Sequence, residues 1–161
     1  MKVSETGDAG DQVLRRLVVG VDGSDGSRSA MTWTARLAKS TDAEILAVHV
    51  LTYNQEFLRD LSLDTLRTWR RDLRGELETG WTDPLRAAGV GYRCLLVEDD
   101  SPAGGLLAVA VREQADVLVV GTRGRGTMAG RVLGGVSYRL LHHADRPVVV
   151  VPLDRARSDS T

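Results

Sequence analysis

The stretch VLVVGTRGRG, residues 117–126, joins an aliphatic run directly to a glycine-rich turn. Residues 117–120 contain no polar side chain, which is typical of a β-strand covered on both faces. The glycines that follow allow the chain to turn sharply and let a ligand approach the backbone closely. A buried strand that ends in such a turn is typical of a parallel sheet flanked by helices, so this stretch indicates the fold class.

Further aliphatic runs occur on both sides of this stretch, at 17–21, 45–51, 94–97 and 148–151. The segments between them have apolar residues at helical spacing, which predicts helices. The first helix follows the N-cap-rich residues 22–27, and the third begins at Asp100-Ser101-Pro102. The apolar residues of the first, second and fourth helices are, in turn, Ala30, Trp33, Leu37 and Ala38; Leu58, Leu61, Leu66, Trp69, Leu73 and Leu77; and Val132, Leu133, Val136, Leu140 and Leu141. Gly80 and Asp83-Pro84 predict a break after the second helix.

This alternation of strands and helices predicts an α/β protein with an open, five-stranded, parallel sheet. Right-handed crossovers make it doubly wound and Rossmann-like, in a three-layer α/β/α arrangement, and we expect the strand order 3-2-1-4-5. Ligands of such sheets bind beyond the carboxyl ends of the strands, at the switch point between strands one and four. We expect one domain at 14–153, with mobile, polar tails at 1–13 and 154–161.

The composition limits the possible partners. The chain has 161 residues, 42% of them hydrophobic and 27% charged, and its net charge is −1. This balance argues against a nucleic acid or an anionic membrane held by bulk charge. No run approaches the ~18 apolar residues of a membrane span. Cys94 is the only cysteine, so no disulfide forms within the chain, and we expect a buried, inert thiol and a cytoplasmic protein.

The glycine-rich loop from Gly121 to Gly135 is the candidate ligand site. Its backbone N–H groups and the N-terminus of the following helix suit anionic groups such as phosphates, and Arg123, Arg125 and Arg131 add positive charge. The loop is not a Walker A motif, because no Gly-Lys-Ser/Thr follows, nor a dinucleotide fingerprint, because Ala129 stands at the third glycine position. A tight connection without a ligand remains the alternative.

The spacing Gly121-x2-Gly124-x9-Gly134 closely resembles the ATP-binding signature of the universal stress protein family. The resemblance extends over most of the chain. VGVDGS at 19–24 resembles the first strand and loop of that family, VHV at 48–50 the end of its second strand, and RLLHHADRPVVVVP at 139–152 its closing helix and strand.

The resemblance implies a site for an adenine nucleotide, ATP in particular, with Mg²⁺ or Mn²⁺ bound through the phosphates. The adenine and ribose would lie against Gly20, Val21, Asp22 and Val50, and the ribose and phosphates against Val120, Gly121, Arg123 and Gly124. The phosphates would be held by Gly134, Gly135, Val136 and Ser137. The family also implies a homodimer that pairs through the last strand, Val148–Val151.

The chain departs from the family pattern at Gly135, where serine or threonine is usual. One side-chain hydroxyl is lost, although the backbone N–H remains and Ser137 supplies a hydroxyl two positions later. A neutral hydrogen bond contributes about 0.5–1.5 kcal/mol, so we expect weakened binding more than its loss.

Several polar residues have a structural alternative beside the functional one. Asp22 contacts the ligand or stabilises the start of the first helix. Arg123 and Arg125 contact phosphates or are solvated. His49 is expected to be structural, as are two potential metal-binding groups. These are the His142-His143 pair, near a helix C-terminus, and the Glu98-Asp99-Asp100 group, which precedes a helix start.

We therefore expect an ATP-binding universal stress protein that acts as a nucleotide-dependent regulator of a stress response or growth state, with an unknown protein partner. The alternatives are a member without nucleotide that acts only through protein contacts, and a slow ATPase. The sequence shows no catalytic constellation, so we do not expect an enzyme. A phospho-receiver domain is excluded because no lysine follows the fifth strand.

Overall fold

The computed structural model describes residues 13–53, 59, 61–124 and 133–153. The tails predicted to be mobile lie outside the described residues, except Val13. The elements follow in the order β1 (Arg16–Gly20), α1 (Asp25–Thr41), β2 (Glu44–Leu51), α3 (Leu63–Glu76), η1 (Leu77–Trp81), α4 (Asp83–Ala88), β3 (Tyr92–Glu98), α5 (Pro102–Arg112), β4 (Val117–Gly121), α6 (Gly135–His143) and β5 (Val148–Val151). η1 is a short π-helix.

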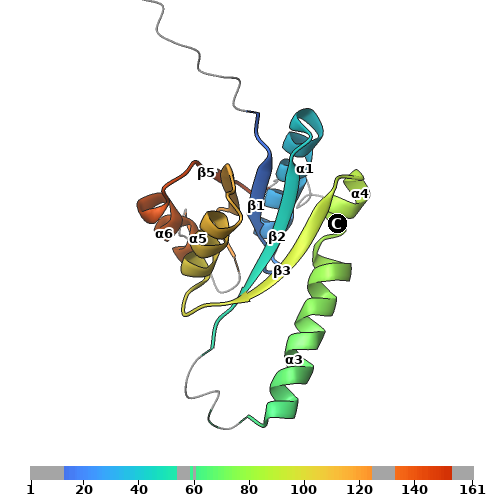
Figure 1. Ribbon diagram of the computed structural model, residues 1–161, viewed down its shortest axis with the longest axis vertical. Helices are drawn as coiled ribbons and strands as arrows, with labels where there is room; N and C mark the ends of the chain where they lie inside the picture. Colours follow the sequence, from blue (N-terminus) through green and yellow to red (C-terminus); the bar gives the residue numbers. More distant parts are fainter. Residues whose placement is uncertain (1–12, 54–58, 60, 125–132, 154–161) are drawn as a thin grey trace, which may run out of the picture.

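The five strands form one parallel sheet in the order β3-β2-β1-β4-β5, which confirms the predicted fold class and strand order (Figure 1). Val18 lies at the centre of the sheet, in register with Leu46 on β2 and Leu118 on β4. All three side chains are fully buried. Strands that are covered on both faces explain the continuous aliphatic runs in the sequence.

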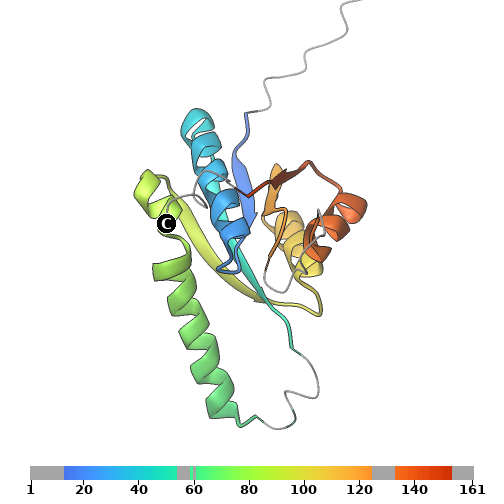
Figure 2. The same ribbon diagram turned by 180° about the vertical axis from the view of Figure 1, so that it is seen from behind.

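Helices cover both faces of the sheet and enclose two hydrophobic cores (Figures 1 and 2). On one face, Met31 of α1 and Leu85 of α4 pack against residues of the sheet that include Val19. On the other face, Leu106 of α5 and Leu140 of α6 pack against residues that include Val18. Consecutive residues of β1 thus belong to opposite cores. In the described part of the chain, no helix is long and apolar enough to cross a membrane.

The second helical segment differs from its prediction. α3 begins at Leu63, because Ser62 caps it by accepting a hydrogen bond from the N–H of Thr65 (3.2 Å). Leu61 therefore precedes the helix, and Leu58 lies outside the described residues. The helix ends at Glu76, and the fully buried Leu77 belongs to η1. The break predicted from Gly80 and Asp83-Pro84 is confirmed, since α4 begins at Asp83.

Two smaller predictions were also wrong. α6 begins at Gly135, with Gly134 as an extended N-cap, so Leu133 is not helical; Val132 lies outside the described residues. Cys94 is only partly buried, because it lies on the edge strand β3. Burial still raises the pKa of the Cys94 thiol, with a smaller opposing effect of a hydrogen bond with Thr82.

Candidate functional site

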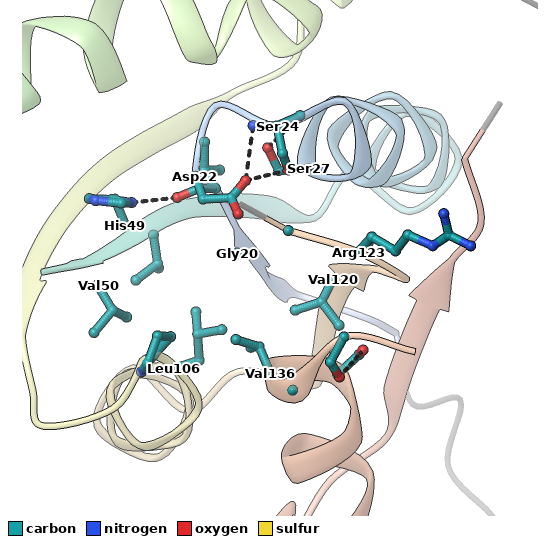
Figure 3. Close-up of a pocket in the computed structure, with 18 residues that line it drawn as sticks. Gly20, Asp22, Ser24, Ser27, His49, Val50, Leu106, Val120, Arg123 and Val136 are labelled. Carbon is teal, nitrogen blue, oxygen red and sulfur yellow. Dashed lines mark hydrogen bonds between the residues drawn. The ribbon is translucent and has the colours of Figure 1, made fainter. Parts of the chain in front are cut away.

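A cavity of about 260 Å³ opens at the carboxyl ends of β1, β2 and β4, where the strand order reverses (Figure 3). The residues that the family resemblance placed against the nucleotide all line this cavity: Gly20, Val21, Asp22, Val50, Val120, Gly121, Arg123, Gly124, Gly134, Gly135, Val136 and Ser137. The lining also includes Ser24, Ser27, Val48, His49, Pro102 and Leu106, which were not predicted. The structure therefore brings together residues that lie more than a hundred positions apart.

The apolar side of the cavity comes from several elements. Figure 3 shows the side chains of Val50, Leu106, Val120 and Val136 around it, from β2, α5, β4 and α6. A Cβ atom at Gly20 would lie only 3.1 Å from Leu106 and 3.2 Å from Val120. Glycine at this position therefore lets Leu106 and Val120 approach the end of β1, where they form an apolar wall.

The loop between β1 and α1 carries the cavity's carboxylate, Asp22. Its Oδ1 atom accepts a hydrogen bond from the N–H of Ser24 (3.0 Å), and the Ser24 side chain accepts one from the N–H of Ser27 (3.2 Å) as the N-cap of α1. The Oδ2 atom lies 2.5 Å from where a Cβ atom at Gly124 would be. Asp22 thus both stabilises the start of α1 and lies against the loop that follows β4.

Backbone hydrogen bonds hold the described ends of the loop after β4. The N–H of Thr122 donates to Val151 O (2.9 Å), and the N–H of Gly134 donates to Thr122 O (2.7 Å). The second bond places the start of α6 beside the end of β4. Arg125 and Arg131 lie outside the described residues. The Arg123 side chain is exposed and points away from the cavity in Figure 3, so its backbone forms the lining.

The N-terminus of α6 forms another wall of the cavity. Gly134 provides no side-chain cap, and helix geometry leaves the first N–H groups of a helix without intrahelical acceptors. Those of Gly135, Val136 and Ser137 therefore suit an anionic group. The Ser137 hydroxyl is buried and donates to Gly134 O (3.0 Å), so it already has an acceptor within its own turn. A Cβ atom at Gly135 would meet nothing within 4 Å.

The two groups considered as metal sites have structural partners. Asp99 Oδ1 accepts a hydrogen bond from the N–H of Ser101 (3.0 Å), next to α5, and Glu98 forms an ion pair with Arg70 (2.6 Å). His142 bonds through Nδ1 to Tyr138 O (2.9 Å). Among the described residues, no group of three or more His, Cys, Asp or Glu side chains could hold a metal ion.

The residues that sequence reasoning missed fall into two kinds. Ser24, Val48 and His49 are neighbours of predicted residues, and Ser24 and Ser27 belong to the N-cap-rich segment 22–27, so local signals were present. Pro102 and Leu106 come from α5, which reaches the cavity only through the packing of that helix on the sheet. No local pattern identifies them.

These features define a class: doubly wound α/β proteins with a cavity at the switch point, between the end of β4 and the N-terminus of α6, where ligands of such sheets bind. Within that class, the chain belongs to the universal stress protein family, which matches residues 14–152. A universal stress protein of Thermus aquaticus is 25% identical over 139 residues, which cover 86% of this chain and 99% of that relative.

Solved structures share the fold. Hypothetical protein MJ0577 superposes with a TM-score of 0.76 at 16% identity, over 89% of this chain and 99% of its own. A universal stress protein in complex with cAMP gives a TM-score of 0.65 at 25% identity, over 89% and 100%. A family protein of Arabidopsis thaliana with AMP bound gives 0.62 at 23% identity, over 91% and 96%. Homologous structures thus hold adenine nucleotides.

Proposed function

We propose that this protein binds an adenine nucleotide, ATP in particular, in the cavity of Figure 3, and that occupancy regulates a stress response or growth state. One observation carries the proposal: an apolar wall from the sheet and α5 faces the same cavity as the N-terminus of α6. A nucleotide needs both environments, one for the base and one for the phosphates.

The apolar side suits a purine. Val50 and Leu106 belong to the hydrophobic core on this face of the sheet and are 9% and 3% exposed, so they form a firm surface for a flat ring. Most of a bound small ligand's surface is usually covered by such apolar side chains, with a few polar groups fixing its orientation. Asp22, at the edge of this surface, suits a ribose hydroxyl. The solved complex with cAMP, at 25% identity, supports the choice of adenine.

The α6 end suits phosphates. Its N–H groups and helix dipole favour an anion, and the glycines at 134 and 135 leave the backbone accessible. The missing hydroxyl at position 135 is the departure that weakens this end. No described residues form a metal cluster, so a Mg²⁺ or Mn²⁺ ion would be held mainly by the phosphates.

We infer a regulatory role without required turnover. The ionisable side chains of the described lining are Asp22, His49 and Arg123. Asp22 accepts a hydrogen bond from the N–H of Ser24, and His49 bonds to Val21 O. Both residues thus have a structural role at the β1–α1 loop, and we infer a site that binds its ligand without needing either of them as a general base. The nucleotide would then act by changing the shape of the site or the choice of a protein partner.

A homodimer through β5 is part of the proposal. β5 pairs with β4 on one side only, and its first three valines are partly exposed. Such an edge invites pairing with another strand, and a second copy of the same edge satisfies it symmetrically.

The decisive test is calorimetric titration of nucleotide-free protein with Mg²⁺–ATP, AMP and adenosine, using a Gly135→Asp variant. An acidic residue in the first turn favours the helix, and the site of its Cβ is open, so the fold should tolerate it. Its charge should repel the phosphates and weaken ATP about tenfold or more, leaving adenosine unchanged. Gly135→Asn is the matched control, equal in shape but uncharged.

Each result has a defined meaning. Loss of ATP affinity in Gly135→Asp alone supports phosphate binding at α6. Unchanged affinities for both ATP and adenosine would place the ligand elsewhere, and equal losses for both would mean that the substitution disturbs the whole site. If wild-type protein shows neither heat nor thermal stabilisation at millimolar ATP, the nucleotide proposal fails. The alternative favoured by Gly135, a family member that acts only through protein contacts, then stands.

A further inference from the structure

His49 connects the cavity to a part of the molecule outside it. Residues alternate along β2: Leu46, Val48 and Val50 belong to the core on the α5 and α6 side, whereas Ile45 and Ala47 belong to the core on the α1 and α4 side. By the same alternation His49 points to the α1 and α4 side. Figure 3 shows its ring at the rim of the cavity, directed at the backbone of the β1–α1 loop.

The contact between His49 and that loop is a hydrogen bond of 2.7 Å from Nδ1 to Val21 O. A carbonyl oxygen only accepts, so Nδ1 must carry a proton. The N–H of Val21 donates in turn to Val48 O (2.8 Å). Both backbone polar groups of Val21 are thus held by β2, one by a main-chain carbonyl and the other by the His49 side chain.

The His49 ring is itself held in place by Trp81. The two rings meet edge to face, with centroids 5.0 Å apart and planes at 69°. Trp81 is the last residue of η1, which is anchored by the fully buried Leu77 and by a hydrogen bond from the Thr82 hydroxyl to Leu77 O (2.8 Å). π-Helical turns are rare and occur often at functional sites. Here the π-helical turn places the Trp81 ring against the His49 ring.

The peptide fixed by His49 leads directly into Asp22. The orientation of this peptide sets where the Asp22 carboxylate lies. Asp22 Oδ1 in turn accepts a hydrogen bond from the N–H of Ser24, the N-cap of α1. We propose that His49 is a positioning residue of the nucleotide site: as its Nδ1–H tautomer, with Trp81 behind it, it fixes the Val21–Asp22 peptide and so orients Asp22 toward the ligand. This inference rests on the proposed nucleotide binding.

Two substitutions separate the hydrogen bond from the ring. His49→Asn keeps an N–H donor near the position of Nδ1 but loses the ring, whereas His49→Phe keeps the ring against Trp81 but loses the donor. We expect His49→Phe to weaken Mg²⁺–ATP at least tenfold in calorimetric titration, and His49→Asn to stay within about threefold of wild type. Melting temperatures, measured in parallel, should not rank the variants in the order of their ATP affinities, because Asn removes the packing against Trp81 that Phe retains.

Two NMR measurements without nucleotide complete the test. Nitrogen-15 shifts should show the Nδ1–H tautomer for His49, and the amide signals of Asp22 and Ser24 should move in His49→Phe more than in His49→Asn. An Nε2–H tautomer, or ATP affinities that simply follow the melting temperatures, would overturn the inference. If wild-type protein binds no nucleotide, the proposed function fails, and the two amide signals alone decide whether His49 orients the loop.

Discussion

Replacing different glycines of the site should change the free energy of unfolding by different amounts, because their surroundings differ. A Cβ atom at Gly121 would lie 2.5 Å from the backbone carbonyl of Gly26, at the start of α1, whereas one at Gly135 meets nothing within 4 Å. We predict that Gly121→Ala lowers the free energy of unfolding by about 1–3 kcal/mol, as overpacking does. Urea unfolding at constant m-value measures it.

The matched control for this prediction is Gly135→Ala. It places the same methyl group in open space at the first position of α6, so we expect no loss and a gain of up to about 0.5–1 kcal/mol from the lower entropy of the unfolded chain. If both alanines destabilise the protein equally, the close approach of α1 to β4 does not depend on glycine at position 121.

Gly135→Ser tests the departure from the family pattern. The new hydroxyl has room at the phosphate end of the cavity, and one added hydrogen bond of about 0.5–1.5 kcal/mol corresponds to roughly a two- to twelvefold gain in ATP affinity. Titration against wild-type protein measures the gain, with adenosine as the ligand that should not respond. An unchanged ATP affinity would mean that the hydroxyl does not reach the phosphates.

At the residue scale, the sequence predicted the lining where the backbone itself forms it. Gly20 and Gly121 end strands and Gly134 caps α6, and the spacing of Gly121, Gly124 and Gly134 carries the family resemblance. Leu106 and Gly26 escaped prediction because their roles arise from contacts between elements distant in the chain. The Ser137 hydroxyl donates to Gly134 O, and its contact with the phosphates stays a prediction.

Among the elements, α3 differs from all the strands. None of its residues is buried, and it extends beyond the sheet in Figures 1 and 2, whereas residues 17–19 of β1 are fully buried. Helices with few buried apolar contacts open locally at low free energy. We predict that amides of α3 exchange with deuterium far faster than those of β1 and β4, as measured by mass spectrometry of peptides. Comparable protection would imply that another chain covers α3.

An ion-pair network joins the amino ends of β1 and β2 to β3. Glu44 pairs with Arg93 (2.5 Å) and Arg16 (3.0 Å). The hydrogen bond from Arg93 has the largest effect on the pKa of Glu44 and lowers it. Burial raises that pKa, but Arg93 and Arg16 together outweigh burial and hold it below its usual 4.5. A carboxylate with a lowered pKa stabilises the fold above its unfolded pKa, and this contribution is lost as the pH falls through the folded value.

Glu44→Gln should therefore destabilise the protein at pH 7 and progressively lose its effect as the pH falls below 4.5 and through the lowered pKa of Glu44. These side chains are 34–48% exposed, so the loss at pH 7 should not exceed about 1 kcal/mol. Chemical unfolding of wild type and variant across this pH range measures it, with Glu76→Gln on an exposed part of α3 as control. A difference in stability that does not shrink as the pH falls would assign the effect to packing instead of charge.

The sequence predicted best those elements that are marked by an uninterrupted run of apolar residues. The strands were found because a doubly covered strand is apolar throughout, and their order followed from the alternation with helices. Helix limits were less certain, since Ser62 and Gly134 decide them by capping geometry. The turn at η1 was read only as a break, because nothing in the local pattern distinguishes a π-helix from the end of an α-helix.

For the molecule as a whole, the two edges of the sheet are where a strand of another copy could pair. β3 lies at one edge and β5 at the other. Pro147 O, just before β5, and Val151 O, at its end, accept hydrogen bonds from the N–H groups of Leu118 on β4 and of Thr122 just after β4. Because backbone groups alternate along a strand, the N–H of Val149 faces β4 and that of Val150 faces the open edge. The proposed dimer would form on that open edge.

Because the N–H groups of Val149 and Val150 face opposite sides of β5, a proline at each position tests a different contact. Val150→Pro removes an N–H that faces the open edge, so we predict that it converts a dimer of twice 17.5 kDa into a folded monomer, seen by light scattering after size-exclusion chromatography. Val149→Pro removes an N–H from the β4–β5 ladder, so it should lower the melting temperature strongly. A wild-type monomer would overturn pairing through β5. A Val150→Pro dimer would show that copies associate through another surface, and the exposed α3 would be the next to examine.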